Sequence, residues 1–336
     1  SQYADSIRSG SRGAENEDFE KIGTRFHTWV KDNHKKIGLS NSNSYYHFIK
    51  GDFEFYSSLY EKIKSYESKY HSEIERLNLT SYWGIASSLS YPLLMASVNK
   101  LDDEDTILEK LKTVSTYIDI LIVTRAINYK GNSQSFLRYT IYSLVKEIRN
   151  KSLIELKGVL REKITSSKES INEIEGFSVN GGNRKFIHYL MARIIHYVER
   201  HIYDNDTIEM YDLMAARKYN RFVLTPIISD YNKYFESFEN EPTYYSTEKK
   251  IGNYLLIRNP VSIEFSPVTR NSKINLLKDE NRIVSSLTNS YTLESTDNDY
   301  LRNNGFIPFE NFHKSINDRT MALNNLIKKI WDVDNI

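Results

Sequence analysis

The spacing of apolar residues is the feature that most limits what this chain can fold into. From residue 45 to about residue 205, apolar side chains recur three and four positions apart, which places them on one face of a helix. One such face consists of Tyr56, Tyr60, Ile63, Tyr66, Tyr70, Ile74 and Leu77. We therefore expect this part of the chain to form several amphipathic helices that pack against one another.

Residues 102–125 predict the clearest of these helices. The segment begins with acidic residues, which favour the positive end of a helix dipole. Its apolar stripe consists of Ile107, Leu111, Val114, Ile118 and Leu121. Four residues further the stripe reaches Arg125, for which two interpretations stay open: a structural ion pair with a neighbouring element, or a contact to a phosphate or another anion.

Turn-forming residues predict the breaks between helices. Residues 129–134 indicate a turn, and residues 176–183 a loop rich in glycine and asparagine. This loop lacks the preceding strand and the following Lys-Ser/Thr pair of a phosphate-binding loop, so we do not assign one. Asn183 can cap the helix that follows. Pro92 predicts either a helix start or a kink, because its nitrogen carries no hydrogen to donate.

The helix expected after Asn183 carries both apolar and basic residues. Its apolar face consists of Phe186, Leu190, Ile194, Tyr197 and His201. We expect the other faces to carry Arg184, Lys185, His188 and Arg193. His188 and His196 are about two helical turns apart, too far to share a metal without further ligands. We interpret each histidine as solvated or satisfied within the core.

The pattern changes after Arg221, where short β-branched runs replace the helical periodicity. Residues 222–227 and 253–257 predict two strands, and the distance between them excludes a tight hairpin. Residues 321–331 predict a last amphipathic helix. The expected fold class is mainly α, with a linker over residues 1–16, a multi-helix domain over 17–205 and a small α+β domain over 206–336.

Composition excludes several function classes. The net charge is +1, from 45 basic and 44 acidic residues, so any contact to DNA requires a local basic patch. The absence of cysteine excludes disulfides, thiolate zinc sites and a cysteine nucleophile. No apolar run approaches the roughly 18–20 residues that span a bilayer, and the N-terminal segment has no secretory apolar core. We expect a cytoplasmic protein without a membrane partner.

Four phrases in order resemble one protein family. They are DFEKIGTRFHTWVKDN (18–33), DILIVTRAINY (119–129), NRKFIHYLMARIIHYVE (183–199) and KKIGNYLLIRN (249–259). They resemble the C-terminal two-thirds of GmrSD-type proteins, which are modification-dependent, type IV-like restriction factors of bacterial anti-phage defence. The resemblance implies a helical region followed by an HNH-like (ββα-metal) nuclease domain. It also implies, as a partner, an N-terminal ParB-like nucleotidase domain or subunit, whose Asp-Gly-Gln-Gln-Arg type motif is absent here.

The family's nuclease signature begins with a strand of the form Tyr-x-Ile-Glu-His-Ile-x-Pro. Its histidine acts as a general base for water, and a Mg²⁺ or Mn²⁺ ion stabilises the leaving oxygen. The best register places Tyr219 on the leading tyrosine and Pro226 on the closing proline. Phe222 then replaces the glutamate and Val223 the histidine, so the expected domain is a degenerate HNH domain. The nearest histidines along the chain are His201 and His313.

The second block of the signature is better retained. Ile251, Gly252 and Asn253 match the family's Ile-Gly-Asn, which makes Asn253 the remaining catalytic candidate. Its alternative interpretation is a turn residue bonded to backbone. The resemblance offers Asn259 or Asn271 for a later asparagine and Lys273 or Lys278 for the lysine that follows it. The candidate phosphate contacts are Arg125, Arg184, Lys185, Lys273 and Lys278.

Three functions remain open from the sequence. The first is a DNA- or partner-binding module that has lost the nuclease chemistry. The second is a Mg²⁺- or Mn²⁺-dependent endonuclease with an atypical base, acting on modified phage DNA. The third is a protein-interaction domain. Residues 183–221 carry five acidic residues beside the basic residues Arg184, Lys185, Arg193, Arg200, Arg217, Lys218 and Arg221.

Overall fold

The computed structural model describes residues 25–204, 208–215, 221–258, 277, 280–287 and 299–336. Within these residues the chain is mainly helical and carries one two-stranded sheet, which confirms the expected fold class at this level. Proximity of Cα atoms divides the chain into two compact units. The first unit comprises residues 1–122 and 131–167 with residue 336, and the second comprises residues 123–130 and 168–335.

The boundary between these units does not coincide with the one drawn from sequence periodicity. Residues 168–204 group with the C-terminal segment by proximity, whereas their helical pattern groups them with the preceding helices. The domain assignment of 17–205 and 206–336 stays a prediction.

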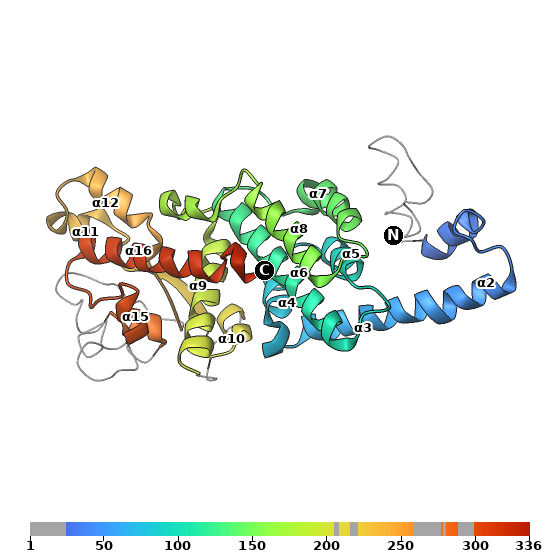
Figure 1. The fold of residues 1–336 in the computed structure, drawn as a ribbon. Coiled ribbons are helices and arrows are strands. Elements are labelled where there is room, and N and C mark those ends of the chain that lie inside the picture. Colours follow the sequence, from blue (N-terminus) through green and yellow to red (C-terminus); the bar gives the residue numbers. More distant parts are fainter. Residues whose placement is uncertain (1–24, 205–207, 216–220, 259–276, 278–279, 288–298) are drawn as a thin grey trace. The chain divides into compact units, whose positions relative to one another are not determined.

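The first unit consists of helices joined by short turns (Figure 1). Its elements are α2 (Ser42–His47), the π-helical η1 (Phe48–Phe53), α3 (Glu54–Ser68), η2 (Ser72–Ile74), α4 (Glu75–Thr80), α5 (Ser87–Ser97), α6 (Glu104–Ile127), α7 (Gln134–Glu147) and α8 (Leu153–Thr165). The end of α6 and the start of α7 confirm the turn predicted at residues 129–134.

Helix α6 is buried on most of its sides. The predicted stripe is confirmed, since Ile107, Leu111 and Val114 are buried. Thr113 and Ser115 are buried as well, so burial extends well beyond that stripe. A helix with so little exposed surface forms the centre of its unit.

Two expectations for the neighbouring helices need correction. Pro92 lies inside α5, so the alternative in which it starts a helix is wrong. On α3 the buried residues are Leu59 and Ile63, whereas Tyr60 is exposed. Leu59, on the adjacent position, enters the core instead of Tyr60.

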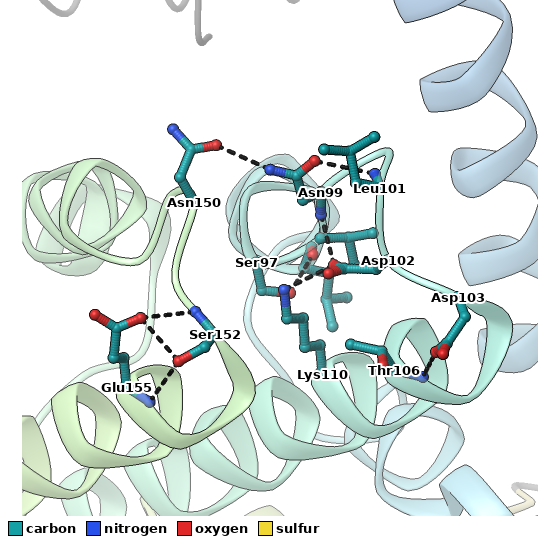
Figure 2. Close-up of polar contacts among 12 residues, drawn as sticks. Ser97, Asn99, Leu101, Asp102, Asp103, Thr106, Lys110, Asn150, Ser152 and Glu155 are labelled. Atoms are coloured by element: carbon teal, nitrogen blue, oxygen red, sulfur yellow. Dashed lines mark hydrogen bonds and ion pairs between the residues drawn. The ribbon is translucent and has the colours of Figure 1, made fainter.

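A buried ion pair fixes the turn between α5 and α6. Lys110 is almost fully buried, and its Nζ donates to Asp102 Oδ2 at 2.7 Å. The same carboxylate oxygen accepts the backbone N–H of Asn99 at 2.8 Å. Figure 2 shows Lys110 pointing from the first turns of α6 toward the turn that precedes it. Asp102 therefore joins the turn to the helix and neutralises a cation that has no contact with water.

A capping box begins α8 in the same part of the unit (Figure 2). Ser152 Oγ accepts the backbone N–H of Glu155 at 3.4 Å, and Glu155 Oε2 accepts the backbone N–H of Ser152 at 2.9 Å. The bond from the Ser152 N–H, together with one from the Ser152 hydroxyl, lowers the pKa of the Glu155 carboxyl group. The two side chains satisfy amides that the first turn of a helix otherwise leaves unpaired.

The second unit combines a long C-terminal helix with the sheet. Its elements are η3 (Ile171–Gly176), α9 (Arg184–Tyr197), the π-helical η4 (Val198–Ile202), α10 (Met210–Met214), β1 (Phe222–Pro226), α11 (Tyr231–Tyr234), η5 (Phe235–Ser237), α12 (Glu241–Glu248), η6 (Ile251–Asn253), β2 (Tyr254–Arg258), α14 (Arg282–Ser285), α15 (Asp299–Asn303), α16 (Phe312–Ile330) and η9 (Val333–Asn335).

The two predicted strands are confirmed and pair with each other. Strands β1 and β2 are antiparallel, with Phe222 opposite Arg258 and Pro226 opposite Tyr254. Residues directly opposite each other share a face of the sheet. Tyr254 lies beneath the guanidinium of Arg184, at 5.8 Å, so its face is turned toward α9.

The other face of the sheet builds the main apolar core of this unit. Leu255 and Ile257 on β2 are fully buried and belong to a cluster with Phe312 and Ile316 of α16. The cluster also includes Ile227, Ile228, Tyr234, Phe238, Tyr244, Leu277, Val284, Leu287 and Phe309. The sheet therefore lies between α9 on one face and α16 on the other.

Helix α9 begins where predicted, but not by the predicted contact. Asn183 occupies the N-cap position, yet its side chain makes no capping bond. Its Nδ2 instead donates to the carbonyl of Ser178 at 2.8 Å, and its Oδ1 accepts the backbone N–H of Asn180 at 2.8 Å. The side chain stabilises the preceding loop rather than the first turn of the helix.

In the part of the chain that the structure describes, no helix combines the length and apolar character needed to cross a bilayer.

We expect the Asp102→Asn variant to lose about 3 kcal/mol of unfolding free energy. The reason is that an isosteric neutral partner leaves the Lys110 ammonium buried without a counter-charge. Urea-induced unfolding measures the difference. The matched control is Glu109→Gln on the same helix, because Glu109 pairs with Lys112 on the surface at 3.2 Å. Exposed pairs contribute about 1 kcal/mol or less, so an equal loss in both variants would contradict the role of Asp102.

Candidate functional site around the Ile-Gly-Asn segment

Val223, at the position expected for the catalytic histidine, lies in the middle of β1. It pairs with Ile257 of β2, and this pair is on the face of the sheet that builds the apolar core. Phe222, at the position of the family's glutamate, is buried on the opposite face, with Arg258 at 5.2 Å from its ring. Both positions therefore hold packing side chains and offer no group that can accept a proton.

Asn253 is fully buried, and its side chain makes four hydrogen bonds to backbone groups. Its Oδ1 accepts the N–H of Ile227 at 3.1 Å and the N–H of Ile228 at 2.9 Å. Its Nδ2 donates to the carbonyl of Ile228 at 3.0 Å and to the carbonyl of Glu248 at 2.8 Å. The amide of an asparagine offers two donors and one acceptor oxygen, so its capacity is used completely. This geometry favours the structural interpretation of Asn253.

Asn253 is also distant from the position of the missing histidine. The backbone N–H of Ile227 donates to the Asn253 carbonyl at 2.7 Å, so Asn253 lies opposite Ile227, beyond the end of β1. Four residues separate Ile227 from Val223 along the strand. At a rise of about 3.3 Å per residue, that separation is about 13 Å. The position expected for the histidine and the Ile-Gly-Asn segment therefore do not converge on one reaction centre.

Gly252 allows η6 to pack directly against α16. A Cβ at this position would lie 2.3 Å from the Ile316 carbonyl oxygen and 2.6 Å from the Thr320 nitrogen. The Gly252 N–H donates to Thr320 Oγ1 at 3.1 Å, and this hydroxyl in turn donates to the Ile316 carbonyl at 2.7 Å. Only glycine fits such an approach of two backbones. The Gly-Asn pair thus has a complete structural explanation.

A chain of polar side chains extends this contact along α16. Thr247 Oγ1 is 2.9 Å from His313 Nδ1, and His313 Nε2 is 3.2 Å from Asn317 Nδ2. Asn317 Oδ1 accepts from Lys250 Nζ at 2.5 Å. Since Asn317 Nδ2 is a donor, His313 Nε2 accepts and His313 Nδ1 carries the proton toward Thr247. His313 Nδ1 therefore holds α12 to α16, while its Nε2 orients Asn317, which receives the bond from Lys250.

These α16 residues were not among the predicted site residues. The signal for them is nonetheless present in the sequence: His313, Asn317 and Thr320 lie four and three positions apart, as one stripe of a helix. The other histidine near the signature, His201, is exposed and stacks on Tyr197 with a centroid distance of 5.1 Å.

Glu248 is an acidic residue whose backbone contacts the side chain of Asn253. Its backbone carbonyl accepts from Asn253, while burial raises the pKa of its carboxyl group and the nearby Lys249 opposes that rise. Among the described residues, no group of three or more His, Asp or Glu side chains has the arrangement of a metal site.

The predicted cationic residues occupy different environments. Arg125 Nη1 lies 3.7 Å from Glu169 Oε1, an ion pair with the segment that follows α8, which favours the structural interpretation of Arg125. Arg184 and Lys185 are exposed at the start of α9, with Arg184 over the Tyr254 ring. Lys273, Lys278, Asn259, Asn271, Arg217 and Lys218 lie outside the described residues.

One residue of α9, Arg193, corrects the expected helix faces. Arg193 is buried rather than on a solvated face, and its Nη1 donates to the Tyr189 hydroxyl at 2.7 Å. Its guanidinium also lies 5.4 Å from the Trp331 ring. His196 is buried, whereas half-buried His188 places Nε2 2.8 Å from the Leu213 carbonyl, in agreement with a histidine satisfied within the fold. Periodicity failed for Arg193 because α9 is enclosed on nearly all sides.

Comparison of this chain with models of protein families, with curated proteins and with solved structures finds no match.

We expect Asn253→Ala to reduce the unfolding free energy by about 3 kcal/mol or more. The variant leaves the Ile228 N–H and two buried carbonyls without partners, and each orphaned group costs about 1–3 kcal/mol. Denaturant titration measures the loss. The matched control is Asn303→Ala on α15, an exposed asparagine whose replacement should change stability by about 0.5 kcal/mol at most. If Asn253→Ala unfolds at the same denaturant concentration as the wild type, the Asn253 side chain does not stabilise the fold by joining these backbone groups.

We expect Gly252→Ala to be destabilised by about 2 kcal/mol or more, because the added methyl group overlaps backbone atoms of α16 that have no room to move. Gly181→Ala is the control, since a Cβ there meets nothing within 4 Å. Thermal unfolding of the two variants beside the wild type gives the comparison. If both alanines are tolerated equally, the close contact of η6 with α16 is wrong.

Proposed function

We propose that this chain is the C-terminal part of a GmrSD-like anti-phage defence protein whose HNH-like region has lost its chemistry and serves as a DNA- or partner-binding module. The observation that carries the proposal is the use of Asn253. Asn253 is the catalytic candidate that remains from the sequence. Its side chain uses all of its hydrogen-bonding capacity for backbone groups. Val223 and Phe222 supply packing where the signature requires a base and an acid.

Valine at the position expected for the catalytic histidine implies a large loss in the rate of cleavage. General base catalysis contributes about 10²–10⁴-fold in rate, and valine can neither accept a proton nor orient a water molecule. This loss supports a binding role rather than an enzymatic one.

The charges of residues 183–221 favour a protein partner over DNA. Within the described part of residues 183–221, Arg193 is buried and Arg200 is paired with Glu209. Exposed basic side chains there are Arg184, Lys185 and Arg221. So few exposed cations predict weak electrostatic attraction to a phosphate backbone.

A cleavage assay tests the loss of chemistry. The 336-residue chain is incubated with unmodified DNA and with DNA that carries modified cytosines, each with Mg²⁺, with Mn²⁺ and with a chelator. We expect intact DNA in every reaction. Metal-dependent cleavage would overturn the proposal and would favour the endonuclease with an atypical base. Glu248→Gln would then test one candidate for that base, because Glu248 is a half-buried carboxylic acid whose pKa is raised by burial.

A mobility-shift titration separates DNA from a protein partner. If DNA is the ligand, log K should fall with log salt at a slope of about −2, and Arg184→Ala should reduce that slope by about one. Lys112→Ala on α6, an exposed lysine of the first unit, is the control that should leave the slope unchanged. Absence of a shift at low salt would exclude DNA and leave the protein-interaction role.

A further inference from the structure

Arg319 on α16 is a buried cation whose contacts are incomplete. Its side chain is among the most enclosed charged groups of the second unit, with 4% of its surface exposed. Nη1 donates to the Ile283 carbonyl of α14 at 3.1 Å, and the guanidinium carbon lies 6.0 Å from the Phe306 ring. Nε and Nη2 are buried as well and have no hydrogen-bond partner. No carboxylate within the described residues pairs with this side chain.

The two nitrogens without partners form a single edge of the guanidinium group. The N–H of Nε and one N–H of Nη2 are parallel, at the spacing of the two oxygens of a carboxylate or phosphate group. Nη1, on the other side, is already used by Ile283. The contact that is missing is therefore one bidentate contact, not two scattered hydrogen bonds.

The surroundings make an empty edge unfavourable. A buried charge without a counter-charge destabilises a fold unless hydrogen bonds or an anion compensate it. The Phe306 ring offers only a weak electrostatic contact at this distance. Burial lowers the pKa of Arg319 to about 9, so the group still carries its charge at neutral pH.

We propose that the Nε–Nη2 edge of Arg319 binds a small oxyanion, a phosphate or a carboxylate, between α16, α14 and the segment around Phe306. The two donor atoms have essentially no solvent-accessible surface, so a duplex backbone could not reach them, and a small oxyanion enters only when the segments around the guanidinium group move apart. Lysine could not replace this arginine, since an ammonium group has no pair of parallel donors. The proposal is independent of the function proposed above, because it concerns neither β1 nor Asn253.

Ligand-dependent stability tests the proposal. The melting temperature of the chain is measured against increasing inorganic phosphate, and separately acetate, with sodium chloride keeping the ionic strength constant. A ligand at ten times its Kd stabilises the folded state by RT ln(1 + [L]/Kd), which predicts that the melting temperature of the wild type rises by about 2 °C. A rise with either anion supports the site, and the two titrations show which oxyanion it prefers.

Two variants make the result specific to Arg319. Arg319→Met keeps most of the side-chain volume and removes the buried charge, so it should fold and lose the response to both anions. Arg319→Lys keeps the positive charge but lacks the two parallel N–H donors, so it should lose at least half of the anion-dependent rise in melting temperature. Arg161→Met on α8, an exposed arginine of the first unit, should respond as the wild type does. An unchanged melting temperature of the wild type in both titrations, or an equal rise in wild type and Arg319→Met, would overturn the proposal.

Discussion

The side chain of Asn253 is the contact on which the second unit depends. It bonds the backbone of Ile227 and Ile228, which follow β1, to the carbonyl of Glu248 at the end of α12. Because Asn253 directly precedes β2, these bonds determine where the second strand starts against the first. A shift by one residue would turn Leu255 and Ile257 away from the core of the unit. One buried amide therefore specifies both the pairing of the strands and the face that they bury.

The first unit uses buried charges in a comparable way. Asp119 is fully buried on α6 and accepts from Arg76 Nη1 of α4 at 2.8 Å, while Lys110 on the same helix is bonded to Asp102. These two ion pairs attach α6 to neighbouring elements at two positions along the helix. Asp119 is also the first residue of the phrase DILIVTRAINY (119–129). The buried position of this carboxylate is explained by its ion pair with Arg76.

Features of this fold that depend on local sequence patterns could be predicted, whereas features that depend on contacts between distant elements could not. Periodicity predicted α6 and both strands because an apolar stripe is a local property of the sequence. It failed for Arg193, where α9 is enclosed by neighbours that no local pattern reveals. Asn183 was placed correctly at the start of α9, but its bonds go to the loop, since several backbone groups compete for one amide. For Asn253, a catalytic and a bridging asparagine have the same sequence signal, and only the contacts distinguish them.

The close approach of Gly252 to α16 has a consequence for dissecting this protein. The sheet and the C-terminal helix are far apart in the chain, yet the backbone of η6 lies against that of α16 without an intervening side chain. A fragment that ends before residue 312 would expose this bare backbone together with Leu255 and Ile257. Excision of the strands, or their transfer into a chimera, is therefore feasible only with α16 included. The smallest transplantable piece is defined by this steric fit and not by the limits of the nuclease-like motif.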